Sequence, residues 1–471
     1  MRPPEASPVT PIDTLIHARW VIPVEPPGVV LEHHAVAVHG GRIVGVLPST
    51  EAKARFEPRV EHRLGDHALI PGLVNAHTHA AMSLFRGLAD DLPLMRWLQE
   101  HVWPAEGRWV SEEFVQDGTR LAVAEMLRGG TTCFNDMYFF PADTARVASS
   151  MGIRAVVGLL VIDVPSVWAR DTDEYLARAI ETHDRFRGDP LVRTAFAPHA
   201  PYTVSDAALA RVATLAEELD VPVHMHVHET ADEVRQGVER HGVRPLARLE
   251  RLGLLTYRLA AVHMTQLEPA EIESAAEHGL CVVHCPESNL KLASGFCPVQ
   301  RLLDAGVPVA LGTDGAASNN DLDLLGEART AALVGKAVAG DAAAVSAWTA
   351  LTMATLHGAR ALGIEEEVGS IVPGKAADLA AIDLSHLETE PVHHPVSQLV
   401  YAASRHQVTD VWVAGRHLLK GRLPTTFDEA ELRQRTRGWG ARIAAGARHR
   451  DTRPDTARGP LSGAVPPGER E

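Results

Sequence analysis

A pair of histidines at the end of a short apolar run is the first candidate for chemistry in this sequence. His77 and His79 stand one position apart in "LVNAHTHAAM", and side chains two positions apart on a strand lie on the same side. Two imidazole nitrogens placed in this way can bind one metal ion. The chain has 25 histidines, so the pair alone does not distinguish a metal site from two unrelated core or surface residues.

Three further apolar runs end in residues that could join such a site. The run "VPVHMHVHE" places His224, His226 and His228 on one side, so spacing alone does not select a ligand. Another run ends in His263, and a third ends in "GTDG" with Asp314. Imidazole nitrogens with one carboxylate oxygen are typical of zinc, although iron or manganese could also bind them. Catalytic zinc lowers the pKa of a water to about 7 and so supplies a nucleophile at neutral pH.

The elements that must position these residues alternate between short β-rich runs and longer segments of helical period. The runs are mostly Val, Ile, Leu and Ala, as in strands buried on both faces. Eight such units predict an α/β fold, a closed (β/α)8 barrel of the TIM type, whose C-terminal strand ends converge on one active-site face. We expect strands at residues 73–79, 131–137, 154–163, 192–200, 221–229, 259–264, 280–288 and 307–315.

Two β-prone pieces flank the barrel and contain Gly-punctuated hairpins, as in "VAVHGGRIVGVLP" and "VTDVWVAGRHLLKG". Neither piece could bury its apolar face alone, so we expect one small β-sandwich built from both chain ends. The last segment is rich in Pro, Gly and charge, which predicts disorder. The predicted organisation is an N-terminal β-sandwich segment at 8–70, the barrel at 71–365, a C-terminal β-sandwich segment at 366–425, a C-terminal helix at 426–450 and a disordered tail at 451–471.

Composition argues against several classes of protein. The chain is 45% apolar and 22% charged, and no stretch approaches the roughly 20 apolar residues of a membrane span. A net charge of -15 disfavours nucleic acid as a partner. The N-terminal segment has no apolar signal region, and the four cysteines form neither a disulfide framework nor a C-x-x-C zinc pair. We therefore expect a cytoplasmic protein with reduced, buried cysteines and no membrane partner.

Several motifs along the barrel resemble those of the amidohydrolase superfamily. They extend from about residue 70 to residue 380. Within the superfamily the pattern is most similar to that of the 5-methylthioadenosine/S-adenosylhomocysteine deaminases, which belong to the TRZ/ATZ-type hydrolases. The s-triazine hydrolases and guanine-type deaminases share much of the same pattern. The matching stretches are "PGLVNAHTHAAMSLFRG", "WPAEGRW", "EMLRGGTTCFNDMY", "APHAPYTVS", "HMHVHET", "HCPESNLKLASG", "LGTDGAASNNDLDLL" and "GSIVPGKAADL".

The resemblance implies which histidines bind the metal ion. In these deaminases the ligand histidine stands three positions before a catalytic glutamate, which here pairs His226 with Glu229. His224 and His228 then become packing or supporting residues. One metal ion per subunit is expected, because the two-metal branch needs a carboxylated lysine and no lysine occurs between His79 and His226. The implied metal ligands are His77, His79, His226 and Asp314.

The implied reaction is hydrolytic deamination of an adenosine-type nucleoside, with ammonia and an inosine-type nucleoside as products. The resemblance makes Asp314 the acceptor of a proton from water, Glu229 the donor of a proton to the purine ring and His263 a stabiliser of the developing charge. It also places Glu106 on the ribose hydroxyls, which a carboxylate can bind in pairs. The alternative for Glu106 is an exposed acid at a helix start. The implied substrate-binding residues are Glu106, His199, Glu229 and Asp314.

Substrate preference depends on a departure from the family pattern. Relatives that accept S-adenosylhomocysteine use arginines near the third strand, whereas this chain has only Arg154, early in that strand. The pattern therefore favours methylthioadenosine, with adenosine, over S-adenosylhomocysteine. The alternatives are s-triazine chlorohydrolase or guanine-type deaminase activity, or a non-catalytic metal-binding scaffold. Family habit predicts a homo-oligomer, either a dimer or a tetramer.

Overall fold

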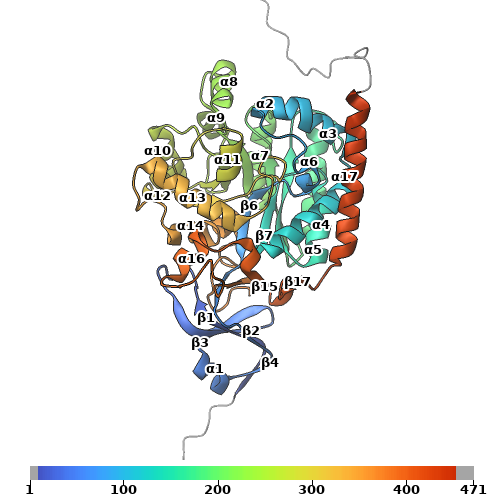
Figure 1. Cartoon of the computed structure of the whole chain (residues 1–471). Helices are drawn as coiled ribbons and strands as arrows, with labels where there is room; N and C mark the ends of the chain where they lie inside the picture. The colour runs from blue at the N-terminus through green and yellow to red at the C-terminus, as the bar shows by residue number, and fades with distance from the viewer. Residues whose placement is uncertain (1–8, 452–471) are drawn as a thin grey trace, which may run out of the picture.

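The computed structural model describes residues 9–451 as a barrel sheet surrounded by helices and a second sheet that extends from it, at the bottom of Figure 1. One sheet has eight parallel strands and the other has nine mixed strands. The predicted α/β class, with a TIM-type barrel and a smaller β-domain from both chain ends, is confirmed. The predicted disordered tail, residues 451–471, lies outside the described residues apart from Asp451, the last residue of a helix.

The eight-stranded sheet forms the barrel, and its strands follow one another in chain order. All eight predicted strands are present, and each ends at least one residue earlier than the sequence pattern suggests. His79, His199, Glu229 and Asp314 therefore lie just after their strands, whereas His77, His226 and His263 are last or next-to-last strand residues, so all of them lie at one end of the barrel. The strands are β6 (Leu73–Thr78), β7 (Thr131–Asp136), β8 (Arg154–Val161), β9 (Val192–Pro198), β10 (Val223–Val227), β11 (Leu259–His263), β12 (Cys281–His284) and β13 (Val309–Leu311).

The ring is completed between β13 and β6 by residues at their ends. The Asn75 side-chain amide donates to Thr313 Oγ1 at 2.8 Å, and the Thr313 N–H donates back to Asn75 Oδ1 at 3.0 Å. The Asp314 N–H donates to the His77 carbonyl oxygen at 3.0 Å. This closure places the first and last strands of the barrel side by side, and with them two of the predicted metal ligands.

Helices cover the outside of the barrel, and alternate strand side chains pack against them in the largest core cluster. Helix α7 begins after Ser205, whose hydroxyl accepts the Ala208 N–H as a capping side chain should. The helices between strands are α4 (Glu112–Arg128), α5 (Pro141–Met151), α6 (Thr172–Phe186), α7 (Asp206–Leu219), α8 (Ala231–His241), α9 (Pro245–Arg251), α10 (Pro269–His278), α11 (Pro286–Lys291), α12 (Val299–Asp304) and α13 (Leu324–Ala339). The loop after β6 contains η1 (Ala80–Phe85), α2 (Leu94–Trp97), η2 (Leu98–Val102) and α3 (Trp103–Trp109).

The nine-stranded sheet joins the two ends of the chain. Its N-terminal strands meet its C-terminal strands where β5 pairs antiparallel with β14. Residues on both faces of the sheet are buried in separate core clusters, one of which includes Ala52 of α1 (Ser49–Arg55). The strands are β1 (Thr10–Val21), β2 (Leu31–His39), β3 (Arg42–Pro48), β4 (Phe56–Arg63), β5 (His67–Pro71), β14 (Leu379–Asp383), β15 (Val408–Val413), β16 (Arg416–Lys420) and β17 (Leu423–Pro424).

A buried ion pair ties the barrel to this sheet. Arg154, the first residue of β8, donates from Nε to Asp378 Oδ2 at 2.9 Å, and its Nη1 lies 3.2 Å from Glu367 Oε2. Arg154 and Asp378 are 4% and 3% exposed, so little solvent competes for either group. Because Arg154 begins its strand, this contact lies at the end of the barrel opposite the site.

The remaining helices complete the molecule. The C-terminal helix α17 (Glu429–Asp451) runs along α4 and η1 (Figure 1), and Trp439 Nε1 donates to Asp117 Oδ2 of α4 at 3.0 Å. All four cysteines are buried and unpaired. Within residues 9–451, no helix has the length and apolar character needed to span a membrane. The other helices are α14 (Ala347–Met353), α15 (Leu356–Ala361), α16 (Pro395–Tyr401) and η3 (Arg405–Gln407).

Candidate metal-dependent active site

Three histidines and one aspartate from the ends of three strands, β6, β10 and β13, converge at the C-terminal end of the barrel. His77 Nε2 and His79 Nε2 each lie 3.3 Å from Asp314 Oδ1, and His226 Nε2 lies 3.3 Å from His77 Nε2. In a tetrahedral zinc site with bonds of about 2.0–2.1 Å, neighbouring ligand atoms are about 3.3 Å apart. The spacing of these four side chains therefore fits a single metal ion.

The second nitrogen of each imidazole is also in contact with a neighbouring group. A carbonyl acceptor on Nδ1 requires a proton there, which leaves the lone pair of Nε2 directed at the centre of the cluster. Both His79 and His226 have such a carbonyl partner. This arrangement orients imidazoles for a metal ion. The three contacts are His77 Nδ1 to His224 Nε2 at 2.8 Å, His79 Nδ1 to the Met137 oxygen at 2.6 Å and His226 Nδ1 to the His199 oxygen at 2.8 Å.

The ionisation of the cluster suits metal binding. Burial alone would raise the pKa of Asp314, but hydrogen bonds and charge from His77 and His79 hold that pKa well below its usual value. Asp314 is therefore a carboxylate. Burial lowers the pKa of His77 to about 4 and that of His226 well below its usual value, so both rings are neutral. Burial also acts to lower the pKa of His79, but Asp314 raises it to about 9, so a metal ion must displace a proton there.

Glu229 and His263 border the metal cluster. Glu229 Oε2 lies 4.0 Å from His263 Nε2, and His263 is also within ligand distance of His77 and Asp314. Burial raises the pKa of Glu229, which is only 7% exposed, and this favours the protonated acid. His263 Nδ1 lies 2.9 Å from Asn289 Oδ1, a contact that places a proton on Nδ1 and turns Nε2 to the site.

The backbone is strained where these residues leave their strands. His228, His263 and Asp314 have φ values of 54°, 77° and 60°, in the left-handed region that side chains other than glycine rarely adopt. The Glu233 carboxylate supports one of these turns, because its oxygens accept the N–H groups of His228 at 2.9 Å and Glu229 at 2.7 Å. These turns place His263, Asp314 and Glu229, the residue after His228, at the end of the barrel.

The two predicted substrate residues also lie beside the cluster. His199 packs its ring against that of His226 with centroids 4.9 Å apart. Glu106 is partly buried in α3, and burial raises its pKa to about 7, against the opposing effects of Tyr138 and His79. Because it is partly buried, Glu106 is not an exposed acid at a helix start. The structure thus brings His199, Glu229 and His263 to the four predicted metal ligands, whereas the role of Glu106 stays a prediction.

The match to known proteins agrees with this geometry. A model of the Amidohydrolase family matches residues 68–418, which include all eight barrel strands and every residue of the site. The chain belongs to the amidohydrolase family. The predicted family and its hydrolase chemistry are confirmed.

Relatives of this amidohydrolase cover nearly its whole length. The 5-methylthioadenosine/S-adenosylhomocysteine deaminase of Saccharophagus degradans is 48% identical, over 93% of this chain and 98% of the relative. The protein of the same name from Teredinibacter turnerae is 47% identical, over 93% and 99% of the two chains.

Solved structures extend the comparison. An adenosine deaminase from Xanthomonas campestris with bound zinc is 59% identical, with a TM-score of 0.92, and the match covers 93% of this amidohydrolase and 100% of that chain. The atrazine chlorohydrolase of Arthrobacter aurescens TC1 is 24% identical, with a TM-score of 0.85 over 90% and 99% of the two chains. At that identity the second comparison supports the fold alone.

Sequence reasoning missed three supporting residues of this amidohydrolase. Ser288 donates to Asp314 Oδ2 at 2.6 Å, and Asn289 orients His263. Both follow β12 in the quoted motif "HCPESN", so their position after a strand was a usable signal. Glu233 had no such signal, because it lies in a polar helix and only the fold shows that its carboxylate is buried.

Proposed function

We propose that this amidohydrolase is a zinc-dependent deaminase that converts 5'-methylthioadenosine, and also adenosine, to the inosine-type nucleoside and ammonia. The observation that carries the proposal is the meeting of a complete zinc ligand set with Glu229 and His263 at one end of the barrel. The named activities of relatives at 48% and 59% identity support the substrate class.

Zinc would be held by His77, His79, His226 and Asp314, whose spacing and supporting contacts fit one metal ion. When bound, zinc supplies Lewis acidity that makes water a nucleophile at neutral pH. The protein contributes one carboxylate and three imidazoles. The rings of His77 and His226 are already neutral, and His79 loses its proton when the metal ion binds. Glu229 and His263 lie 4.0 Å apart beside these ligands, and they are acid and base groups of the kind that a hydrolytic site needs.

Glu229 has the properties of the acid that activates the purine. The carbon that carries the amino group is a poor electrophile until the adjacent ring nitrogen is protonated. Burial raises the pKa of Glu229, which favours the protonated form of the acid that would donate to that nitrogen. Thr265 Oγ1 donates to the Glu229 carbonyl oxygen at 2.7 Å and helps to fix the turn that carries the acid.

Asp314 and His263 would act on the attacking water and on the oxygen that it adds to the substrate. Asp314 is ionised, so it can accept the proton that the attacking water loses and deliver it to the departing amino group. Ser288 holds its Oδ2 atom and keeps the carboxylate in position. His263 presents Nε2 to the site, where it can stabilise charge that develops on the oxygen at the reacting carbon.

Glu106 and His199 would select a nucleoside. The Glu106 carboxylate can accept hydrogen bonds from both ribose hydroxyls, and triazine substrates have no such diol. Arg154 cannot reach a substrate carboxylate, because it pairs with Asp378 and Glu367 at the other end of β8. We therefore rank S-adenosylhomocysteine below methylthioadenosine and adenosine.

The proposal is tested by ammonia release at fixed enzyme concentration, with zinc measured on the same sample. The substrates are methylthioadenosine, adenosine, S-adenosylhomocysteine, guanine and a chlorotriazine. We expect the first two to give the highest kcat/KM and the last two to give no turnover. Preference for guanine or the triazine would replace the proposed activity with another one of the family. Equal behaviour of zinc-loaded and zinc-free protein in every assay would favour a non-catalytic scaffold.

Assembly and location are further proposals from the sequence. We propose a homo-oligomer in the cytoplasm. Light scattering coupled to size-exclusion chromatography distinguishes a monomer from a dimer or tetramer, and cell fractionation tests the location.

A further inference from the structure

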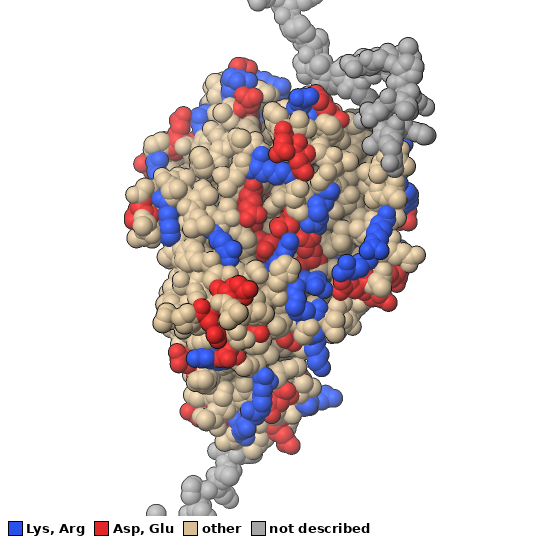
Figure 2. Space-filling view, in the orientation of Figure 1, with Lys and Arg blue, Asp and Glu red and all other residues tan. Residues whose placement is uncertain are grey.

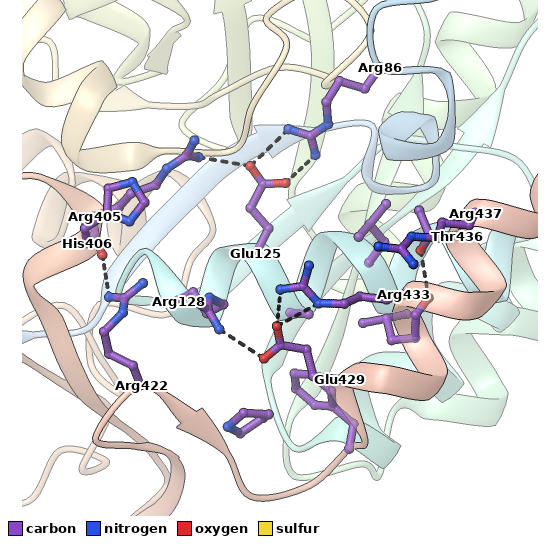
Figure 3. Close-up of a pocket in the computed structure, with 15 residues that line it drawn as sticks. Arg86, Glu125, Arg128, Arg405, His406, Arg422, Glu429, Arg433, Thr436 and Arg437 are labelled. Carbon is purple, nitrogen blue, oxygen red and sulfur yellow. Dashed lines mark hydrogen bonds and ion pairs between the residues drawn. The ribbon is translucent and has the colours of Figure 1, made fainter. Parts of the chain in front are cut away.

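Lys and Arg side chains, with Asp and Glu side chains among them, gather beside the N-terminal half of α17 on the face drawn in Figure 2. They surround a pocket of about 480 Å³ (Figure 3), and none of its lining residues belongs to the metal cluster. Pockets of roughly 300–1,000 Å³ are typical of small-molecule sites. The lining combines residues between Arg86 and Arg128 with residues between Arg405 and Arg437.

Positive charge exceeds negative charge in this lining, which has six arginines and two glutamates. Glu125 lies on one side and is shared, because its Oε1 accepts from Arg86 at 3.1 Å and from Arg405 at 3.0 Å. Arg405 also approaches Asp321 at 3.3 Å and Asp323 at 3.9 Å, behind the pocket wall. Even with these two aspartates included, arginines outnumber carboxylates around the pocket.

Arginines also outnumber carboxylates on the other side of the pocket. Glu429 is shared by Arg128 at 3.1 Å and by Arg433 at 3.0 Å. Among the described residues, the Arg422 side chain donates only to two backbone carbonyl oxygens, at 2.6 and 2.8 Å. Within the described residues of the chain, neither Arg422 nor Arg437 has a carboxylate at ion-pairing distance. Figure 3 shows these side chains coming from α4, the segment before β17 and α17 around the same space.

The excess positive charge of the pocket is concentrated around Arg422. Burial, together with the positive charges of Arg128 and Arg405, lowers the pKa of Arg422, so this guanidinium lies in a positive potential that its neighbours do not neutralise. The protein as a whole carries a net charge of -15, which opposes the approach of anions to most of its surface. A local arginine excess against that background indicates an anionic ligand.

We propose that this arginine pocket binds a small organic phosphate. Guanidinium groups bind phosphate oxygens in pairs, and Arg422 and Arg437 have donors to spare for them. Phe427, Pro424 and Leu432 provide an apolar wall for the organic portion of the ligand. The proposal does not depend on the deaminase activity, because none of these residues belongs to the metal cluster or to its supporting contacts.

The test measures binding of phenyl phosphate and of inorganic phosphate to the zinc-loaded protein by titration calorimetry at about 150 mM salt, where weak surface attraction is screened. We expect one saturable site per chain and tighter binding of phenyl phosphate, because only it can use the apolar wall. The double variant R433Q/R437Q should weaken binding at least tenfold. The control R435Q/R442Q removes the same charge from the same helix at positions that do not line the pocket, and should change affinity less than twofold.

Three results would overturn the proposal. The first is the absence of saturable heat with either probe. The second is an equal loss of binding in both double variants, which would indicate a general charge effect. The third is sedimentation showing that the unmodified chain self-associates and R433Q/R437Q does not, so that a second copy covers the pocket. Thermal unfolding checks that both double variants are folded. If R433Q/R437Q does not fold, the difference in affinity between phenyl phosphate and inorganic phosphate on the unmodified protein still tests the proposal.

Discussion

Nδ1 of His77 and Nε2 of His224 lie 2.8 Å apart inside the barrel, where both rings are fully buried. The contact joins a metal ligand of β6 to a residue of β10 that does not itself belong to the ligand set. Such supporting partners fix the orientation of a ligating imidazole and its basicity. His224 is thus a positioning residue of the site.

We predict that His224→Leu lowers zinc affinity about 10- to 100-fold, because His77 loses the partner that orients it. Competition with a chromophoric chelator measures the affinity. His284→Leu is the matched control, since it removes a buried histidine at the end of β12 that makes no hydrogen bond to the four ligands in the described structure. An equal loss in both variants would assign the effect to general destabilisation of the barrel.

Glu229→Gln should retain zinc and lose at least about a hundredfold in kcat, because proton transfer by a positioned side chain contributes roughly 10²–10⁴-fold. Steady-state deamination of adenosine and elemental analysis of the same preparation check the two halves of this prediction. Glu277→Gln, an exposed change on α10, should behave as the unmodified protein. Turnover of Glu229→Gln at a near-normal rate would remove this residue from the mechanism.

Asn289 should influence the reaction only through His263. We expect Asn289→Leu to lower kcat about 10- to 100-fold with zinc content and KM little changed, because the acceptor that holds His263 Nδ1–H is lost. Asn289→Asp keeps an acceptor at the same place and should recover most of the rate. If both variants lose the same activity, a role in packing would explain the result better.

Glu106 predicts a pH dependence of nucleoside binding. Only the ionised carboxylate accepts two hydrogen bonds, and burial raises the pKa of Glu106 to about 7. As pH falls below 7 the carboxylate becomes protonated, so kcat/KM for adenosine should fall through a rise in KM. Glu106→Gln should lower kcat/KM about 10- to 100-fold at pH 8, which is the loss expected for hydrogen bonds to a charged group, and should flatten this region of the profile.

A substrate without the diol provides the control for Glu106. With 2',3'-dideoxyadenosine, the unmodified protein and Glu106→Gln should have similar kcat/KM values, because neither can make the ribose contact. A loss of the same size with both substrates would show that Glu106 acts on something other than the sugar.

Arg154 should matter for stability rather than for substrate. Arg154→Met leaves Asp378 as an uncompensated buried carboxylate, so we expect the free energy of unfolding to fall by about 3–5 kcal/mol in urea titrations. Arg193→Met is the matched control, because Arg193 also pairs with Glu367 but is 42% exposed in its side chain, and exposed pairs contribute about 0–1 kcal/mol. The ratio of activity on S-adenosylhomocysteine to that on adenosine should not change in the folded Arg154→Met protein. A selective loss with S-adenosylhomocysteine would instead place Arg154 on the substrate.

Local patterns in the sequence determined the barrel and most of its chemistry. Strands buried on both faces are recognisable as short β-branched runs, and polar residues at their ends are recognisable as site candidates because parallel strands end on the same face. His77, His79, His263 and Asp314 could be selected in this way. The choice of His226 over His224 and His228 needed the family resemblance, because all three share a side of the strand.

Only the tertiary structure decided what holds these residues and what else the molecule carries. The contacts of His77 with His224 and of Arg154 with Asp378 span 147 and 224 residues of chain, and no local periodicity encodes such pairs. The arginine pocket likewise combines residues 86–128 with residues 405–437. Local propensity determines which segments form strands and helices, whereas partners, burial and pKa values depend on which distant segments the packed core brings together.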